Sequence, residues 1–124
     1  MTPDTTTTPG RGDTFAPKFD AAGLLTAVVV SAADNRVLMV AHMDAEALAK
    51  TRASGLAHFH SRSRGRLWLK GETSGNLLHV EEIRVDCDQD TLVLVARADG
   101  PACHTGAQSC FFRRLAGDAL ITES

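Results

Sequence analysis

LLTAVVVS at residues 24–31 and RVLMVAH at residues 36–42 give the strongest indication of the fold in this sequence. Both runs are rich in apolar and β-branched residues, a composition typical of buried strands. Asp34 and Asn35 lie between them and are residues that favour a tight turn. The two runs therefore predict a β-hairpin at the start of the folded region.

A helix is predicted directly after this hairpin. Asp44 is a favourable N-cap, and residues 45–53 are mostly good helix formers. Gly55 is placed where a glycine commonly ends a helix.

The remainder of the folded region predicts further strands. They cover residues 57–60, 67–70, 78–85 and 91–98. A β-bulge is expected at Glu81 and Glu82, where the apolar alternation changes phase. Residues 109–113 are expected to form a short closing strand. The predicted fold class is α+β, mostly antiparallel sheet with one clear helix.

The 124 residues predict a single domain preceded by a leader. Residues 1–18 are rich in Thr, Pro and Gly, so we expect a disordered leader there and one folded domain at 19–124. The formal charge of −2 favours neither nucleic acid nor an anionic membrane as a partner. The apolar runs are too short to span a bilayer, and no export signal precedes them, which favours a reducing cytoplasm.

The three cysteines indicate a metal site rather than disulfides. Cys87 is separated from Cys103 by fifteen residues, and Cys103 from Cys110 by six. This spacing differs from that of a structural zinc knuckle, and three ligands would leave one zinc position open for water. The alternative interpretation is that these are small buried apolar residues.

Three carboxylates alternate around the first cysteine, at Asp86, Asp88 and Asp90. Carboxylates are hard ligands that suit Mg²⁺ or Ca²⁺. In an extended strand the outer two would lie about 13 Å apart, so the segment must curl into a loop if all three bind one ion. Otherwise they are three solvated acids. His104, next to a candidate zinc ligand, is the first choice for a catalytic base, and His79 is the second.

A basic and glycine-rich stretch suggests phosphate binding. SRSR at residues 61–64 and LWLKGETSGN at residues 67–76 combine guanidinium, ammonium, hydroxyl and glycine amide groups. A solvated basic turn is the alternative. Together with a hydrolytic zinc, however, such a surface suggests a phosphorylated substrate, which would be held by Arg62, Arg64, Lys70 and Ser74.

At these residues the sequence resembles phosphoribosyl-AMP cyclohydrolase, the enzyme that opens the adenine ring in histidine biosynthesis. The matching runs are SRSR, LWLKGETSGN, DCDQD at residues 86–90 and PACHTGAQSCF at residues 101–111. The resemblance covers about residues 18–115. The sequence departs from it at His42 and His60, where aromatic residues are expected.

The resemblance implies an intertwined homodimer with one zinc per subunit, shared across the interface. Cys87 would come from one chain, and Cys103 with Cys110 from the other. It also implies magnesium at the three aspartates and zinc-dependent hydrolysis of the N1–C6 bond of phosphoribosyl-AMP. A separate pyrophosphohydrolase is expected to supply that substrate.

Other functions fit the sequence less well. A zinc nucleobase deaminase would account for His79-Val80-Glu81, but it requires a P-C-x-x-C motif that the spacing of Cys103 and Cys110 does not match. A non-catalytic zinc-stapled dimerisation module is the alternative from another class. A nucleic-acid binder fits least, because the aromatic residues form no series among the basic ones.

Overall fold

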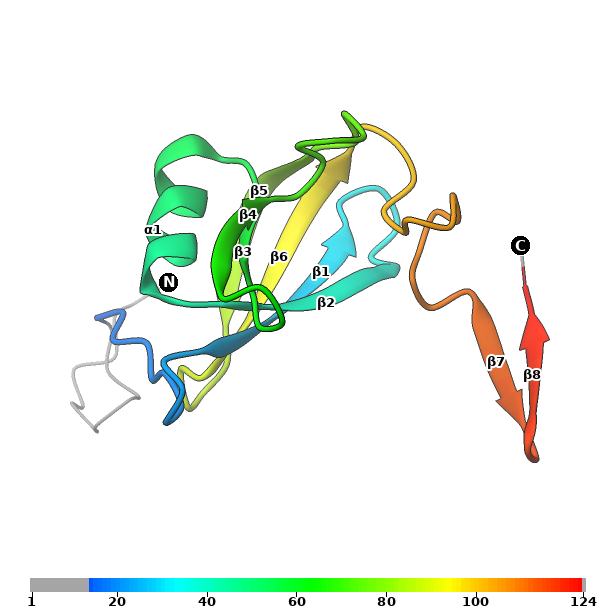
Figure 1. Cartoon of the computed structure of the whole chain (residues 1–124). Helices are drawn as coiled ribbons and strands as arrows, with labels where there is room; N and C mark the ends of the chain where they lie inside the picture. Colours follow the sequence, from blue (N-terminus) through cyan, green and yellow to red (C-terminus); the bar gives the residue numbers. More distant parts are fainter. Residues whose placement is uncertain (1–13, 124) are drawn as a thin grey trace.

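A four-stranded sheet forms the centre of this computed structural model, which describes residues 14–123 (Figure 1). The strand order is β2-β1-β6-β5, with bounds β1 Leu25–Ser31, β2 Val37–Met43, β5 Leu78–Val85 and β6 Thr91–Ala98. The β1–β2 pair is antiparallel, as the predicted hairpin requires. The β5–β6 pair is also antiparallel, whereas the central β1–β6 pair is parallel. The α+β class with a mostly antiparallel sheet is thus confirmed, with one parallel ladder at its middle.

Local sequence signals account for the hairpin and the bulge. Asn35 adopts φ +62°, and the Asp34 carboxylate accepts a hydrogen bond from the Arg36 amide at 3.0 Å. Both residues tolerate such tight turns. The register of β5 against β6 shifts between Val80 and Glu82, which confirms the predicted bulge.

The predicted helix is present as α1, Ala45–Ser54. The Asp44 carboxylate accepts a hydrogen bond from the Ala47 amide at 2.8 Å, which satisfies one of the free amides of the first turn. Gly55 ends the helix in the left-handed region at φ +77°, and its amide donates to the Thr51 carbonyl. Both predicted caps are confirmed.

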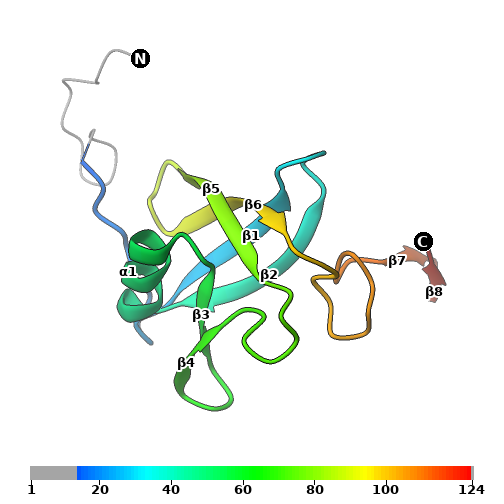
Figure 2. The ribbon, with the colours of Figure 1, turned by 90° about the horizontal axis from the view of Figure 1, so that it is seen from above.

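A second layer covers one face of the sheet. It consists of α1 and a two-stranded sheet of β3, His58–Ser61, and β4, Arg66–Leu69, which lie together on one side in Figure 2. Phe59 of β3 is fully buried, and its ring lies 5.3 Å from that of Trp68, centroid to centroid. The main core therefore lies between the four-stranded sheet and this layer.

The closing strand expected at residues 109–113 is wrong. Residues 109–112 are outside any strand, and a separate hairpin follows, formed by β7, Arg113–Ala116, and β8, Ala119–Thr122. The Cys110 amide donates to the Leu38 carbonyl at 2.8 Å, and the Ser109 hydroxyl donates to the Val37 carbonyl at 2.6 Å. These isolated hydrogen bonds hold residues 109–112 at the edge of β2, but they do not form a strand ladder with it. The β7–β8 hairpin stands apart from the four-stranded sheet (Figure 1).

The predicted leader falls mostly outside the described residues, and only residues 14–18 of it are described. In that part, the Ala16 amide donates to the Gln89 side chain at 2.6 Å, and the Lys18 amide donates to the Gln89 carbonyl at 2.7 Å. Phe15 packs against the core. Within residues 14–123, no helix is long and apolar enough to cross a membrane.

Candidate active site

A cavity of about 620 Å³ brings together most of the predicted catalytic and substrate-binding residues. Its walls include both arginines of the β3–β4 turn, the end of β4, the following loop, and the loop that carries Cys103. The predicted residues that line it are Arg62, Arg64, Lys70, Ser74, Cys103 and His104. Segments far apart in the sequence therefore meet around one space of a size suited to a small molecule.

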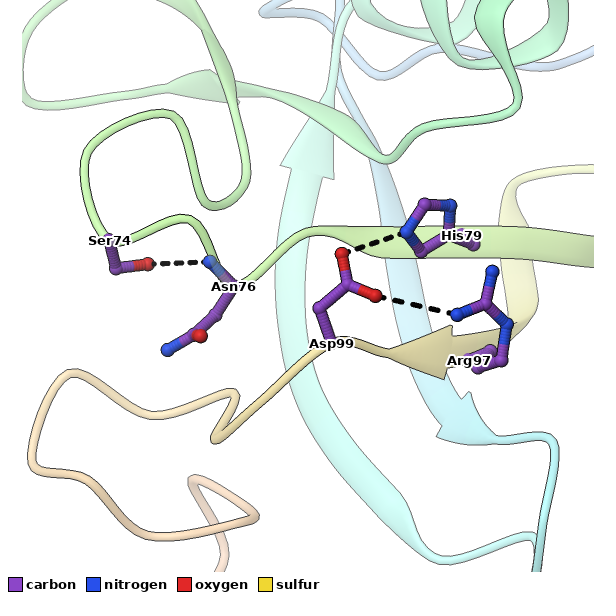
Figure 3. A network of polar contacts seen from close by, with 5 residues as sticks. All are labelled: Ser74, Asn76, His79, Arg97 and Asp99. Atoms are coloured by element: carbon purple, nitrogen blue, oxygen red, sulfur yellow. Dashed lines mark hydrogen bonds and ion pairs between the residues drawn. The ribbon is translucent and has the colours of Figure 1, made fainter.

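The loop at residues 71–76 forms one wall and depends on close backbone contact. Gly71 has φ +89°, and a Cβ added there would lie 2.5 Å from the carbonyl carbon and oxygen of Asn76. The Gly75 amide donates to the Gly71 carbonyl at 2.8 Å, and the Ser74 hydroxyl accepts from the Asn76 amide at 3.2 Å (Figure 3). The glycine therefore allows the loop to close on itself.

Asn76 also joins this loop to the cysteine loop. Its side-chain amide donates to the Pro101 carbonyl at 3.4 Å. A Cβ at Gly100 would collide with the same side chain. The two walls of the cavity are thus packed against one another through Asn76, the last residue of the GETSGN motif, which was not among the predicted site residues.

The thiols of Cys103 and Cys110 lie next to each other. A hydrogen bond from the Thr105 hydroxyl to Cys103 Sγ, 3.0 Å long, is the main cause that lowers the pKa of Cys103. Desolvation raises the pKa of Cys110, and a hydrogen bond with Cys103 raises it further. Lys70 is close enough for its positive charge to favour both thiolates. These two predicted zinc ligands are therefore adjacent within one chain.

Cys87 lies at the other end of β6. Figures 1 and 2 both show the turn before β6 and the loop after it at opposite ends of that strand. The eight residues of β6 span about 23 Å from first to last, at a rise of roughly 3.3 Å per residue. Two sulfurs that bind one zinc lie within about 4.6 Å of each other, since each Zn–S bond is about 2.3 Å. One chain therefore does not bring Cys87 to the other two cysteines.

The three aspartates gather in the turn between β5 and β6. One carboxylate oxygen from each of Asp86, Asp88 and Asp90 lies within 4.8 Å of the others. Asp86 Oδ1 accepts hydrogen bonds from the Asp90 amide at 3.0 Å and the Thr91 amide at 3.2 Å. Gln89, at φ +60°, turns the chain. The segment has the curled shape that binding of a single ion would require.

The carboxylates in this turn influence each other's protonation. Desolvation acts to raise the pKa of Asp86, but hydrogen bonds with Asp90 and nearby amides outweigh it and lower the pKa. The hydrogen bond with Asp86 raises the pKa of Asp90, and desolvation and the negative charges of Asp86 and Asp88 add to this. Crowded carboxylates of this kind favour a bound cation, which would relieve their repulsion.

The two candidate bases have different surroundings. His104 is exposed and lines the cavity beside Cys103. His79 lies outside the residues that line the cavity, and its Nε2 is 2.8 Å from Asp99 Oδ2, while Asp99 Oδ1 accepts from Arg97 at 3.4 Å (Figure 3). His79 is therefore part of a hydrogen-bonded network at the end of the sheet, and of the two candidate bases His104 is the one that lines the cavity.

Three aromatic or imidazole side chains were not predicted as part of the site. His42, His60 and Trp68 also line the cavity. His60 Nδ1 lies 3.2 Å from Asp44 Oδ2, in an orientation that forms no hydrogen bond. The signal in the sequence was present: both histidines are the positions that depart from the aromatic residues expected in the resembling family.

We predict that Gly71→Ala destabilises the protein more than the matched change Gly75→Ala. Both glycines have positive φ, +89° and +81°, but space around Gly75 is open within 4 Å. Gly75→Ala should cost about 1–2 kcal/mol, and Gly71→Ala about 3 kcal/mol, because overpacking against Asn76 adds to the strain. Urea unfolding of the two variants measures the difference. Equal free energies of unfolding would contradict the close approach.

Comparison with known proteins identifies the family. The family model described as phosphoribosyl-AMP cyclohydrolase matches residues 39–112. The chain is 61% identical over 110 residues to the phosphoribosyl-AMP cyclohydrolase of Sphingopyxis alaskensis, covering 89% of this chain and 87% of that protein. It is 57% identical over 119 residues to that of a Chelativorans species, covering 92% and 86%. The resemblance found in the sequence is confirmed, and the chain belongs to the phosphoribosyl-AMP cyclohydrolase family.

Proposed function

We propose that this chain is a zinc-dependent phosphoribosyl-AMP cyclohydrolase that hydrolyses the N1–C6 bond of the adenine ring in histidine biosynthesis. The observation that carries the proposal is the single cavity that holds Cys103 and His104 together with the phosphate-binding candidates Arg62, Arg64 and Lys70. Hydrolysis of a phosphorylated nucleotide requires the groups that bind phosphate and the groups that activate water to lie within one substrate length of each other. Their presence around the same cavity supports the proposal.

The cysteines fit a zinc ion that two subunits share. Cys103 and Cys110 offer adjacent thiols, and the Thr105 hydroxyl favours the thiolate form of Cys103, which is the form that binds metal. Cys87 of a second subunit would complete the set, because the length of β6 separates it from the other two within one chain. Zinc bound there would supply an acidified water and polarise the reacting carbon.

Magnesium fits the acidic turn by the chemistry of its ligands. Asp86, Asp88 and Asp90 offer three hard oxygens within 4.8 Å of one another. In a dimer that shares zinc, the acidic turn and Cys87 of one subunit would both lie at the cavity of the other subunit. The ion would then help to hold substrate phosphate or organise the turn.

The residues of the chain have separate tasks in the reaction. Arg62, Arg64 and Lys70 bind phosphate oxygens through charge-assisted hydrogen bonds, and Ser74 binds phosphate or ribose. Water adds to C6, the N1–C6 bond breaks, and the ring opens. His104 accepts a proton from the attacking water and returns it to the departing N1, so the imidazole ends the cycle as it began.

Purified protein incubated with phosphoribosyl-AMP should show the ultraviolet change of purine ring opening. We expect turnover to disappear when a chelator removes zinc and to return when zinc is added back. Protein with one zinc per chain, supplied magnesium and no turnover would contradict the proposal. That result would favour a structural zinc module instead.

His104→Asn should lower kcat by at least about a hundredfold, the usual contribution of a positioned acid–base group. His79→Asn is the matched control, because His79 pairs with Asp99 away from the cavity. It should leave kcat close to that of the wild type. Steady-state kinetics of both variants at equal zinc content distinguishes them, and equal loss in the two would remove His104 from the assigned role.

Mixed dimers test whether zinc is shared. Cys87→Ser and Cys103→Ser homodimers should each lack turnover and tightly bound zinc. Co-expression of the two variants should restore about a quarter of the wild-type value of both, because half of the dimers are mixed and each mixed dimer contains one intact site of two. A mixture as inactive as its components would contradict sharing.

A further inference from the structure

Gln89 is the buried member of the acidic turn. Only 6% of its surface is exposed, whereas the three aspartates around it are exposed. It also has φ +60°, and within residues 14–123 Asn35 is the only other non-glycine residue with a positive φ. The side chain of glutamine disfavours this left-handed conformation, so contacts around the residue must hold it there. The neighbours of Gln89 therefore determine the shape of the turn.

Those neighbours belong to residues 14–18, which we call the N-terminal segment. The Ala16 amide donates to Gln89 Oε1 at 2.6 Å, and the Lys18 amide donates to the Gln89 carbonyl at 2.7 Å. Pro17 lies between them, has no N–H and favours an extended chain, in which the amides on either side of it point the same way. One residue of the turn is thus bonded twice to a segment that lies 73 positions earlier in the sequence.

The N-terminal segment is itself anchored to the domain. Phe15 packs against the core, and the guanidinium carbon of Arg52, in the last turn of α1, lies 5.4 Å from the centre of its ring. Phe19, directly after the segment, packs against the core as well. These anchors lie on both sides of Ala16 and do not involve the turn. The segment can therefore hold the turn in place.

The conformation of Gln89 determines where the carboxylates lie. Its amide donates to the Asp86 carbonyl at 3.0 Å, and its left-handed backbone reverses the chain between Asp88 and Asp90. One oxygen from each of the three carboxylates thereby comes within 4.8 Å of the others. Like charges this close repel each other. Without a cation that repulsion favours a more open turn, and the hydrogen bonds from the N-terminal segment oppose the opening.

We propose that Gln89 is a positioning residue for the cation at the acidic turn, and that the N-terminal segment and the cation stabilise each other through it. The inference rests on the magnesium proposed above and deepens it by assigning to residues 14–18 control over the affinity for the ion. A cation that binds the gathered carboxylates more tightly than the open turn also favours the bonded segment, because coupling between two equilibria is reciprocal.

Gln89→Met should weaken the binding of Mn²⁺, used as a paramagnetic probe of the magnesium site. Methionine has a similar size and meets the same strain at positive φ, but it has no amide oxygen to accept from Ala16. Loss of a group that orients metal ligands typically weakens metal affinity about 10–100-fold, so the dissociation constant should rise at least about tenfold. Electron paramagnetic resonance of the full-length, zinc-loaded protein without substrate measures it.

Two proline variants form a matched pair for the same measurement. Ala16→Pro removes the amide that donates to Gln89, and it should weaken Mn²⁺ binding as Gln89→Met does. Ala21→Pro is the control. It follows Asp20 in a turn closed by a hydrogen bond from the Gly23 amide to the Asp20 carbonyl, a position that suits proline. Within residues 14–123, no backbone hydrogen bond joins Ala21 to the acidic turn, so this variant should bind Mn²⁺ as the wild type does.

Amide hydrogen exchange tests the coupling from the other side. Saturating Mg²⁺ should slow exchange of the Ala16 and Lys18 amides by about the same factor by which Gln89→Met weakens cation binding, since the coupling is reciprocal. A residue that only stabilised the fold would show no such dependence on the cation. Asp88→Asn removes one carboxylate of the site, and in that variant Mg²⁺ should leave the exchange unchanged.

Three results would overturn the proposal: no binding of Mn²⁺ to the wild type, equal Mn²⁺ affinity in the wild type and Gln89→Met, or exchange at Ala16 and Lys18 that does not respond to bound Mg²⁺. Circular dichroism shows whether each variant is folded, and Ala16→Pro carries the test if Gln89→Met does not fold. None of these measurements needs substrate. Coupling in a protein that hydrolyses nothing would refute the proposed function alone. A hydrolase whose cation affinity ignores Gln89→Met would refute the positioning role alone.

Discussion

The length of β6 is the constraint on which the arrangement of the site depends. This strand is central and buried, and it carries the acidic turn with Cys87 before its first residue and the cysteine loop after its last. Because a strand is stiff and extended, its two ends remain about 23 Å apart. In the zinc-sharing dimer proposed above, Cys87 of one subunit would lie beside the cysteine loop of the other. The length of β6 would then set the distance between the two parts that each subunit contributes.

Much of the fold was predictable because its signals are local. The caps at Asp44 and Gly55, the turn at Asp34 and Asn35, and the bulge after Val80 each depend on neighbouring residues. The parallel pairing of β1 with β6 joins residues 65 positions apart in the sequence, such as Thr26 and Thr91, and strand composition does not indicate which distant strands pair. Residues 109–112 misled because their apolar character suggested a strand, whereas a hydroxyl and one amide satisfy the edge of β2 instead.

The candidate site residues were chosen by residue type, and the structure gathers only some of them. Lys70, Cys103 and the two arginines of the β3–β4 turn line the cavity, whereas Cys110 is not among its lining residues and Cys87 lies at the other end of β6. The role of Asn76 was not predicted because it consists of contacts with Gly100 and Pro101. Contacts between residues so far apart in the sequence are visible only in the folded structure. His42 and His60 were visible as departures, yet only the structure shows that both face the cavity.

Gln89 connects the acidic turn to the beginning of the described chain. Its side chain and carbonyl accept hydrogen bonds from the amides of Ala16 and Lys18, and it is nearly buried although its neighbours Asp88 and Asp90 are exposed. The segment at residues 14–18 therefore braces the loop that holds the carboxylates. An affinity tag or a truncation placed close to Thr14 would consequently disturb the arrangement of the three carboxylates, although they lie more than 70 residues away in the sequence.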